Sequence, residues 1–170
     1  MSKTLYMFLY IMSRRFEEKK MYWGRSTWQL FHSIGEKVDP SFYARNRYLI
    51  LDMIKLICKN LPCPDCARHA TSFMNNVHPD SVPNKREFRA MLFVFHNSVN
   101  SRIGKPQFHH SRLIEHKNAN MGIVLQNFLT FFAKRYNGTI QAGITSTEMT
   151  RRRISSNVAG WFKSNWQYFM

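Results

Sequence analysis

The sequence contains few of the residues that form turns and covalent staples. Its 170 residues include seven glycines, six prolines and three cysteines. A β-sandwich or barrel needs many tight turns, so this scarcity favours a helical fold. Three cysteines are too few for a disulfide-stapled secreted module, and a zinc site of four cysteines cannot form within one chain. The seven histidines leave a mixed cysteine and histidine site open.

Acidic residues are also scarce, and long apolar runs are missing. The chain has ten Asp and Glu residues and 25 Lys and Arg residues, which gives a net charge of +15. Such an excess suits a nucleic acid or an anionic membrane. The only tight basic run is Arg151-Arg152-Arg153, however, and we expect no dedicated nucleic-acid function.

The apolar stretch Leu5–Met12 does not have the features of a membrane or secretion signal. A membrane-spanning helix needs roughly 20 apolar residues, and this stretch is much shorter. One lysine precedes it, and no small-residue cleavage site follows it. We therefore expect residues 1–22 to be an N-terminal extension, with no membrane span and a cytoplasmic location.

The most informative stretch is Leu61-Pro62-Cys63-Pro64-Asp65-Cys66, which holds two of the three cysteines. Its prolines suit a loop that enters the first turn of a helix, where a missing N–H costs little. At a helix start, unpaired N–H groups and the helix dipole stabilise a thiolate. The spacing alone fits either a redox-active dithiol or half of a zinc site. The third cysteine, Cys58, ends an apolar helical stripe and is expected to be a buried packing residue.

Apolar residues recur at three- and four-residue intervals over most of the chain, which predicts amphipathic helices. The clearest helix begins after Asn84, with Glu87 three residues later, and ends at Gly104-Lys105-Pro106. The helices expected from these patterns cover residues 26–37, 41–59, 66–74, 85–103, 121–136 and 147–166. The sequence therefore predicts an all-α fold.

Two of these helices carry polar side chains in apolar surroundings. Trp28 and His32 are four residues apart and share one face of the first helix. The simplest explanation is a core tryptophan beside a hydrogen-bonded histidine. In the fourth helix, His96, Asn97 and Asn100 interrupt an apolar stripe. A buried polar group without a partner costs about 1–3 kcal/mol, so three of them indicate a polar ligand lying across this helix.

Taken together, these elements resemble the Erv/ALR family of FAD-dependent sulfhydryl oxidases. The likeness spans Trp23 to Phe108. The amino-acid sequence around the dithiol is most similar to the compact family members encoded by large cytoplasmic DNA viruses. The motifs that carry the resemblance are Gly24-Arg25-Ser26-Thr27-Trp28 with His32, Cys63-Pro64-Asp65-Cys66, and His96-Asn97-Ser98-Val99-Asn100 with Gly104-Lys105-Pro106.

The resemblance implies a four-helix bundle with a short fifth helix, which binds FAD and is followed here by a helical C-terminal extension. It divides the chain into an N-terminal extension (1–22), a sulfhydryl oxidase domain (23–110) and the C-terminal extension (111–170). A substrate dithiol would reduce the cysteine pair, and electrons would pass through FAD to oxygen, giving a disulfide and hydrogen peroxide.

The resemblance also assigns roles to individual residues. Cys63 is the exchange cysteine and Cys66 the flavin-contacting one, and no metal is expected. The residues carried over as FAD contacts are Gly24, Arg25, Trp28, His32, His69, His96, Asn97, Val99, Asn100 and Lys105.

The same resemblance predicts the partners and the location. Thioredoxin-like or folding thiol proteins are the expected substrates, and molecular oxygen is the acceptor. A homodimer is expected, with the first two helices at the interface. A viral origin implies the host cytoplasm, with packaging in the virion as a further expectation.

The sequence departs from the family pattern in three places. Many members join the fourth helix to the segment after Lys-Pro by a structural disulfide, and Phe93 and His110 stand at the corresponding places here. Glu115-His116-Lys117 replaces a flavin-stacking tryptophan. Residues 111–170 have no counterpart in the family. We expect the apolar side chains of residues 121–166 to pack on the bundle core or on a second subunit.

Two alternatives remain at this point. One is a zinc-binding or nucleic-acid-binding helical module that uses Cys63, Cys66, His69 and either His109 or His110. The other is a scaffold that holds FAD without oxidising dithiols. A zinc module would be colourless, whereas a flavoprotein is yellow, and only an oxidase consumes oxygen with a dithiol.

Overall fold

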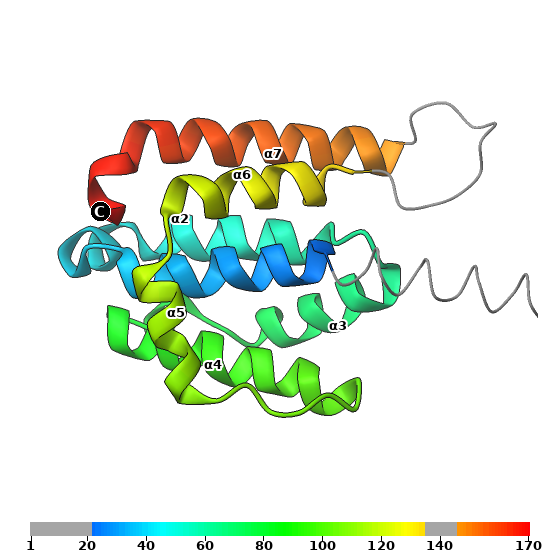
Figure 1. Ribbon diagram of the computed structural model, residues 1–170, viewed down its shortest axis with the longest axis horizontal. Helices are drawn as coiled ribbons and strands as arrows, with labels where there is room; N and C mark the ends of the chain where they lie inside the picture. The colour runs from blue at the N-terminus through cyan, green and yellow to red at the C-terminus, as the bar shows by residue number, and fades with distance from the viewer. Residues whose placement is uncertain (1–21, 135–145) are drawn as a thin grey trace, which may run out of the picture.

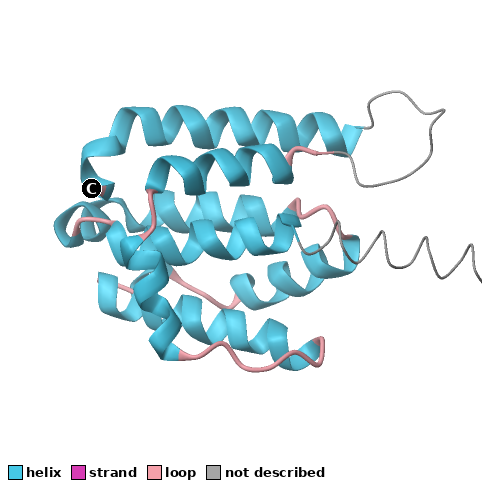
Figure 2. Cartoon of the chain, viewed as in Figure 1, coloured by secondary structure: helices cyan, strands magenta, loops and turns pink. Residues whose placement is uncertain are grey.

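The computed structural model describes residues 22–134 and 146–170, and every regular element among them is a helix (Figure 2). The first helix is described over residues 22–37 and is called the N-terminal helix below. The α-helices that follow are α2 (Pro40–Lys59), α3 (Pro64–Asn75), α4 (Lys85–Arg102), α5 (Leu113–Asn118), α6 (Met121–Phe132) and α7 (Ser146–Asn165). Three short 3₁₀ turns are η1 (Pro79–Ser81), η2 (His110–Arg112) and η3 (Trp166–Phe169). The predicted all-α fold is confirmed.

Capping side chains explain where several helices begin. The Asp39 carboxylate accepts a 2.7 Å hydrogen bond from the N–H of Phe42 at the start of α2. The Asn84 side chain accepts from the N–H groups of Arg86 and Glu87 at the start of α4, as the sequence indicated. The end of α4 is fixed by Gly104, whose φ of 66° lies in the left-handed region that favours glycine.

The helices form three layers (Figure 1). The N-terminal helix and α2 lie in the middle, with α3 and α4 on one side and α6 and α7 on the other. This central position explains why the N-terminal helix is buried on nearly every side. Its buried residues include both apolar and polar side chains: Trp23, Ser26, Thr27, Leu30, Phe31, His32, Ser33 and Ile34.

The C-terminal helices share one hydrophobic core with the bundle, so the prediction that they fold back onto it is confirmed. Phe128, Phe162 and Phe169 are fully buried in the same cluster as residues of the N-terminal helix and α2. The Phe42 ring stacks on Tyr168 at 4.1 Å between centroids. The N–H of Asp39 donates a 2.7 Å hydrogen bond to the Tyr168 carbonyl. The extension is thus a third layer of the fold.

Several expected helix limits differ from the observed ones by one to four residues, and the sequence pattern did not predict α5, although the resemblance implied a short fifth helix. The N-terminal helix is already present at residue 22, four residues before its expected start, and α2 and α7 each differ by one residue at one or both ends. Helix α3 starts at Pro64 rather than residue 66, because Cys63 caps it and proline fits the first turn. Helix α4 stops at Arg102, one residue early. Helix α6 stops at Phe132, and the expected stop at Asn137-Gly138 lies outside the described residues. The missed helix, α5, has six residues and no side-chain cap. No described helix is long and apolar enough to cross a membrane.

Candidate redox and cofactor site

The two cysteines of the Cys-Pro-Asp-Cys stretch form a disulfide at the start of α3. Cys63 is the N-cap of this helix, and its Cα lies 5.2 Å from that of Cys66. The N–H of Cys66 points at the Cys63 sulfur, with 3.3 Å between nitrogen and sulfur. When the pair is reduced, this N–H and the helix dipole stabilise a thiolate on Cys63. The local structure therefore suits thiol–disulfide exchange.

The two cysteines differ in exposure. A cysteine that exchanges with substrates is expected to be the more exposed of the pair, and the structure shows the reverse. Cys63, to which the resemblance assigns exchange, is only 8% exposed, whereas Cys66 is half-buried. Cys63 and the buried Trp23 form a small apolar cluster apart from the main core. Leu61, Cys66 and Phe131 pack against this cluster. Apolar side chains, two of them aromatic, therefore cover Cys63.

A cluster of stacked rings lies between the N-terminal helix, α4 and the segment after α4. Trp28 stacks on His96 with 4.2 Å between centroids and 7° between planes. His32 and His96 share a 2.9 Å hydrogen bond between Nε2 and Nδ1. Phe108 stacks on both histidines, at 4.7 Å from His32 and 4.6 Å from His96. The sequence-predicted residues Trp28, His32 and His96 are thus brought together.

The ring cluster also contains His116, which the sequence marked only as the replacement for a tryptophan. Its ring stacks on that of His32 with 4.9 Å between centroids. It lies on the missed helix α5, and neither the role of α5 nor that of Phe108 was visible in a local pattern. The sequence signal that could have found His116 was the substitution itself.

The histidines of the cluster are held in their neutral forms. Burial lowers the pKa of His32 to about 2, with further lowering by His116 and His96. Burial lowers the pKa of His96 to about 4, and the neighbouring His116, Arg112 and Lys105 lower it further. Burial likewise lowers the pKa of His116. At neutral pH the cluster therefore presents uncharged planar rings next to cationic side chains.

The two asparagines of α4 hold the segment that follows the helix. Asn97 makes two hydrogen bonds to Phe108: its Nδ2 donates to the carbonyl at 3.1 Å, and its Oδ1 accepts from the N–H at 2.7 Å. Asn100 is buried, and its Nδ2 donates to the Pro106 carbonyl at 3.1 Å. Both side-chain amides are therefore bonded within the chain, and Asn97 positions the ring of Phe108.

The place of the missing family disulfide is taken by a ring contact. Phe93 on α4 stacks on His110 with 3.8 Å between centroids and 16° between planes. Together with the bonds from Asn97 and Asn100, this stack ties the segment after α4 back onto the helix. Noncovalent contacts here connect the two elements that the family disulfide connects.

Of the other predicted site residues, only Lys105 is tied to the ring cluster among the described interactions. Arg25 and Lys105 are exposed, and Lys105 is close enough to affect the pKa of His96. His69 is exposed on α3, whereas Val99 packs against the main core. Gly24 is half-buried, and no atom lies within 4 Å of the position that a Cβ would take. A row of rings, Phe73–Phe95–Trp28, connects α3 with the ring cluster.

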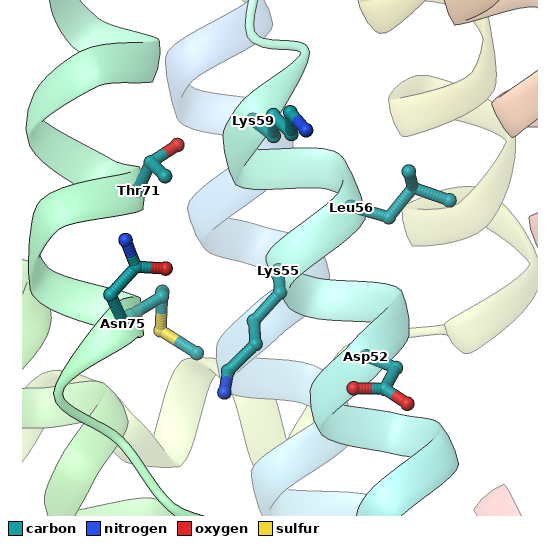
Figure 3. Close-up of a pocket in the computed structure, with 7 residues that line it drawn as sticks. Asp52, Lys55, Leu56, Lys59, Thr71 and Asn75 are labelled. Carbon is teal, nitrogen blue, oxygen red and sulfur yellow. The ribbon is translucent and has the colours of Figure 1, made fainter.

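A separate open pocket of about 250 Å³ lies between α2 and α3 (Figure 3). Figure 3 shows Asp52, Lys55 and Lys59 on one helix and Thr71 and Asn75 on the other. It is lined by none of the predicted site residues and by no aromatic ring. Its volume is below the roughly 300–1,000 Å³ of ordinary ligand pockets. We assign it no part in the redox site.

The remaining cysteine and the zinc alternative are resolved by the same geometry. Cys58 is a free, buried thiol, and burial raises its pKa, as expected for a packing residue. The sulfurs of Cys63 and Cys66 are bonded to each other rather than available as ligands. Within residues 22–134 and 146–170, no group of three or more His, Cys, Asp or Glu residues could hold a metal ion. The zinc module therefore lacks a ligand set in this part of the chain.

Known proteins are similar to about half of this chain. A putative FAD-linked sulfhydryl oxidase, 096R of Invertebrate iridescent virus 3, is 34% identical over 88 residues, which cover 50% of this chain and 58% of that protein. The FAD-linked sulfhydryl oxidase of African swine fever virus (isolate Warthog/Namibia/Wart80/1980) is 29% identical over 85 residues, covering 50% and 71%. The rice (Oryza sativa subsp. japonica) FAD-linked sulfhydryl oxidase ERV1 is 31% identical over 85 residues, covering 50% and 43%.

The chain thus spans 43% to 71% of the length of these three relatives. No solved structure matches it significantly. Residues 25–120 match the Erv1 / Alr family, and this segment includes the disulfide, α4 and the ring cluster up to His116 on α5. The division at residue 110 stays a prediction. Since the match covers more than half of the 170 residues, the chain belongs to the Erv1 / Alr family.

Proposed function

We propose that this protein is an FAD-dependent thiol oxidase that makes disulfide bonds in other proteins. The observation that carries the proposal is the Cys63–Cys66 disulfide at the start of α3, joined by a row of rings to a cluster of stacked, neutral side chains. A helix-capping disulfide can accept electrons from a dithiol. Membership of the Erv1 / Alr family and the names of the three relatives agree with this activity.

The residues around the ring cluster fit FAD. Trp28, His96 and Phe108 offer parallel planes suited to stacking on a flat heterocycle. Lys105 and Arg112 lie near His96 and would favour the phosphates. Gly24 leaves space where a side chain would project. The neutral histidines can each donate or accept a hydrogen bond.

When bound, FAD supplies a two-electron acceptor that returns to its oxidised form by reducing oxygen to hydrogen peroxide. The protein's own part is disulfide exchange. A substrate thiolate attacks the Cys63 sulfur, the bond to Cys66 breaks, and Cys66 leaves as a thiolate. The second substrate thiol, as its thiolate, then attacks the substrate sulfur of this mixed disulfide and expels Cys63. The substrate gains a disulfide, and the chain holds two reduced cysteines.

The Cys66 N–H makes Cys63 the better thiolate of the pair, because it can stabilise the negative charge on that sulfur. This supports the role of Cys63 in exchange, although the residue is largely covered. Cys66, which is half-buried, then takes the flavin-contacting role that the resemblance assigns to it.

Partners, location and assembly belong to the same proposal. Thioredoxin-like or folding thiol proteins are the proposed substrates. The iridescent virus and African swine fever virus relatives support a viral disulfide pathway. The proposed location is the host cytoplasm, with packaging in the virion. The homodimer stays a prediction. Helices α6 and α7 lie on the outward side of the N-terminal helix and α2 (Figure 1), so another surface would have to form the interface.

The test is oxygen uptake by purified, yellow protein supplied with dithiothreitol. We expect Cys63→Ser and Cys66→Ser each to abolish uptake while the protein keeps its FAD, because exchange needs both sulfurs. Cys58→Ser is the matched control and should change the rate little, since Cys58 is a free thiol buried in the main core rather than in the Trp23–Cys63 cluster. Colourless protein, or oxygen uptake that survives in Cys66→Ser, would show that the proposal is wrong.

A further inference from the structure

The side chains of Trp23, Leu61 and Phe131 cover Cys63 and are called the cover below. One of them, Phe131, lies outside the region that matches the family. Phe131 lies near the end of α6, beyond residue 120, where the family match ends. It packs against the small cluster formed by Trp23 and Cys63. Its ring also stacks on that of Tyr22, with 5.4 Å between centroids and 18° between planes. The C-terminal extension therefore reaches the redox disulfide.

Three parts of the chain meet at this end of the molecule. The start of the N-terminal helix, the connection between α2 and α3, and the end of α6 lie together at the right of Figure 1. They bring Trp23, Leu61 and Phe131, respectively, to the disulfide. The exposed fraction of Trp23 is 6% and that of Cys63 is 8%, whereas Tyr22 remains 53% exposed at the edge of the cover. The result is an apolar surface that continues from solvent to the sulfur.

The cover differs from ordinary core packing because it surrounds a reactive sulfur. The Trp23–Cys63 cluster is separate from the main hydrophobic core, whose members on α6 are Met121, Val124, Phe128 and Phe132. Phe131 therefore faces the sulfur cluster, while its neighbour Phe132 faces the core. Disulfide exchange needs an attacking thiolate to approach the sulfur directly. The rings of Trp23 and Phe131 must therefore move aside, or the substrate must make its own contacts with them as its thiol enters.

We propose that Trp23 and Phe131 select the thiols that the enzyme oxidises, admitting polypeptide dithiols with an apolar side chain beside the cysteine. This inference rests on the proposed function and names its substrate class. A hydrophilic thiol that displaces Trp23 and Phe131 exposes their apolar surface to water and makes no apolar contacts that would offset this cost. A substrate with a neighbouring apolar ring replaces the lost contacts with its own. Phe131 thus acts as a specificity residue supplied by the extension.

The test compares two reduced peptides of the same sequence, each with two cysteines. One peptide has phenylalanine next to each cysteine, and the other has serine there. Reduction of the Cys63–Cys66 disulfide is followed without oxygen, by acid quenching and alkylation of the new thiols in the intact protein. We expect the parent protein to react roughly tenfold faster with the phenylalanine peptide, because one partly buried ring contributes about that factor. In Phe131→Ala most of this preference should disappear.

Two variants on the same helix serve as controls. Leu129→Ala removes a side chain that packs against the main core, and it should keep the preference. Phe131→Trp retains an aromatic cover and should also keep it. Phe131→Leu provides a milder change in case Phe131→Ala does not fold, and it should show an intermediate preference.

Either of two outcomes would overturn the proposal: a parent protein that reacts equally with both peptides, or a Leu129→Ala protein that loses the preference as fully as Phe131→Ala. The ratio is measured without oxygen and does not need the flavin to turn over. Failure of oxygen uptake with dithiothreitol would instead refute the proposed oxidase function. The two failures are therefore distinguishable.

Discussion

His32 and His96 show how single residues couple the site to the stability of the protein. Both rings are held neutral by burial, with pKa values lowered to about 2 and about 4. In the unfolded chain they would bind protons near pH 6.5. Between the unfolded and folded pKa values, the unfolded state binds more protons, so stability rises with pH there and falls on acidification.

The resulting prediction is a loss of folding free energy below pH 6.5. Each histidine should remove about 1.4 kcal/mol per pH unit, down to about pH 4 for His96. His96→Asn should therefore make the dependence less steep by about that amount. The measurement is urea unfolding of flavin-free protein between pH 5 and 6.5. His69→Gln, at an exposed position, is the control. Equal slopes in His96→Asn and the parent would contradict the prediction.

At the scale of elements, the important unit is α4 with the segment after it. Asn97, Asn100 and Phe93 each hold one point of that segment, at Phe108, Pro106 and His110 respectively. The sequence predicted that the buried polar groups of α4 would satisfy a ligand directly. In the structure, both asparagine amides donate to backbone carbonyls of the segment after α4, and Asn97 also accepts from the N–H of Phe108. Asn97 therefore positions the Phe108 ring, and direct contact of the asparagines with a ligand stays a prediction.

We therefore expect Asn97→Ala to reduce both stability and flavin content. The change leaves the N–H and carbonyl of Phe108 without their partner, which costs about 1–3 kcal/mol. It also frees Phe108 from its place against His32 and His96. The measurements are the melting temperature and the ratio of flavin to protein absorbance after purification.

Ser101→Ala is the control for this change, because the Ser101 hydroxyl is exposed and accepts from the exposed Gln107 side chain. Asn100→Leu and His96→Ala should likewise give folded but flavin-poor protein. Full flavin occupancy in all three variants would mean that these residues are ordinary packing partners and that the cofactor lies elsewhere.

Much of the element order could be predicted because its signals are local. Asn84 caps α4 and Gly104 ends it, and both act on their own backbone neighbourhood. Helix α5 was missed because its six residues have no side-chain cap and little room for a periodic pattern. The contact of Phe131 with the Trp23–Cys63 cluster joins residues over 60 positions apart, which no local pattern can reveal.

At the scale of the whole molecule, the acidic residues are few and most of those described are paired, so positive charge dominates the surface. Six of the eight Asp and Glu residues in the described chain form ion pairs with arginines, for example Glu36 with Arg89 at 2.7 Å. Four of these pairs are exposed and add little stability, whereas the carboxylates of Glu36 and Glu148 are buried. All six pairs do consume negative charge, so the surface is dominated by the remaining Lys and Arg. Acidic thiol proteins should therefore be attracted to it, more strongly at low salt.

The third layer of helices governs stability and assembly at this scale. Helices α6 and α7 bury Phe128, Phe132, Ile154, Val158 and Phe162 against the central helix pair. Removing residues 121–170 would expose the apolar side of that pair, including Phe42 and its stacking partners. The truncated chain would keep α5 and the whole family match.

We expect this truncation to lower the melting temperature and to increase self-association, giving either a higher oligomer than the intact chain or aggregates. Sedimentation velocity and thermal melts of the two chains test this directly. Within the intact chain, Phe162→Ala, at a position that is 0% exposed, should cost about 3–5 kcal/mol. Met149→Ala, where methionine is 61% exposed, should cost little and is the matched control on α7. A layer that shares the core cannot be removed without exposing that core. If the truncated chain has the same melting temperature and the same association state as the parent, α6 and α7 are therefore a docking module rather than part of the fold.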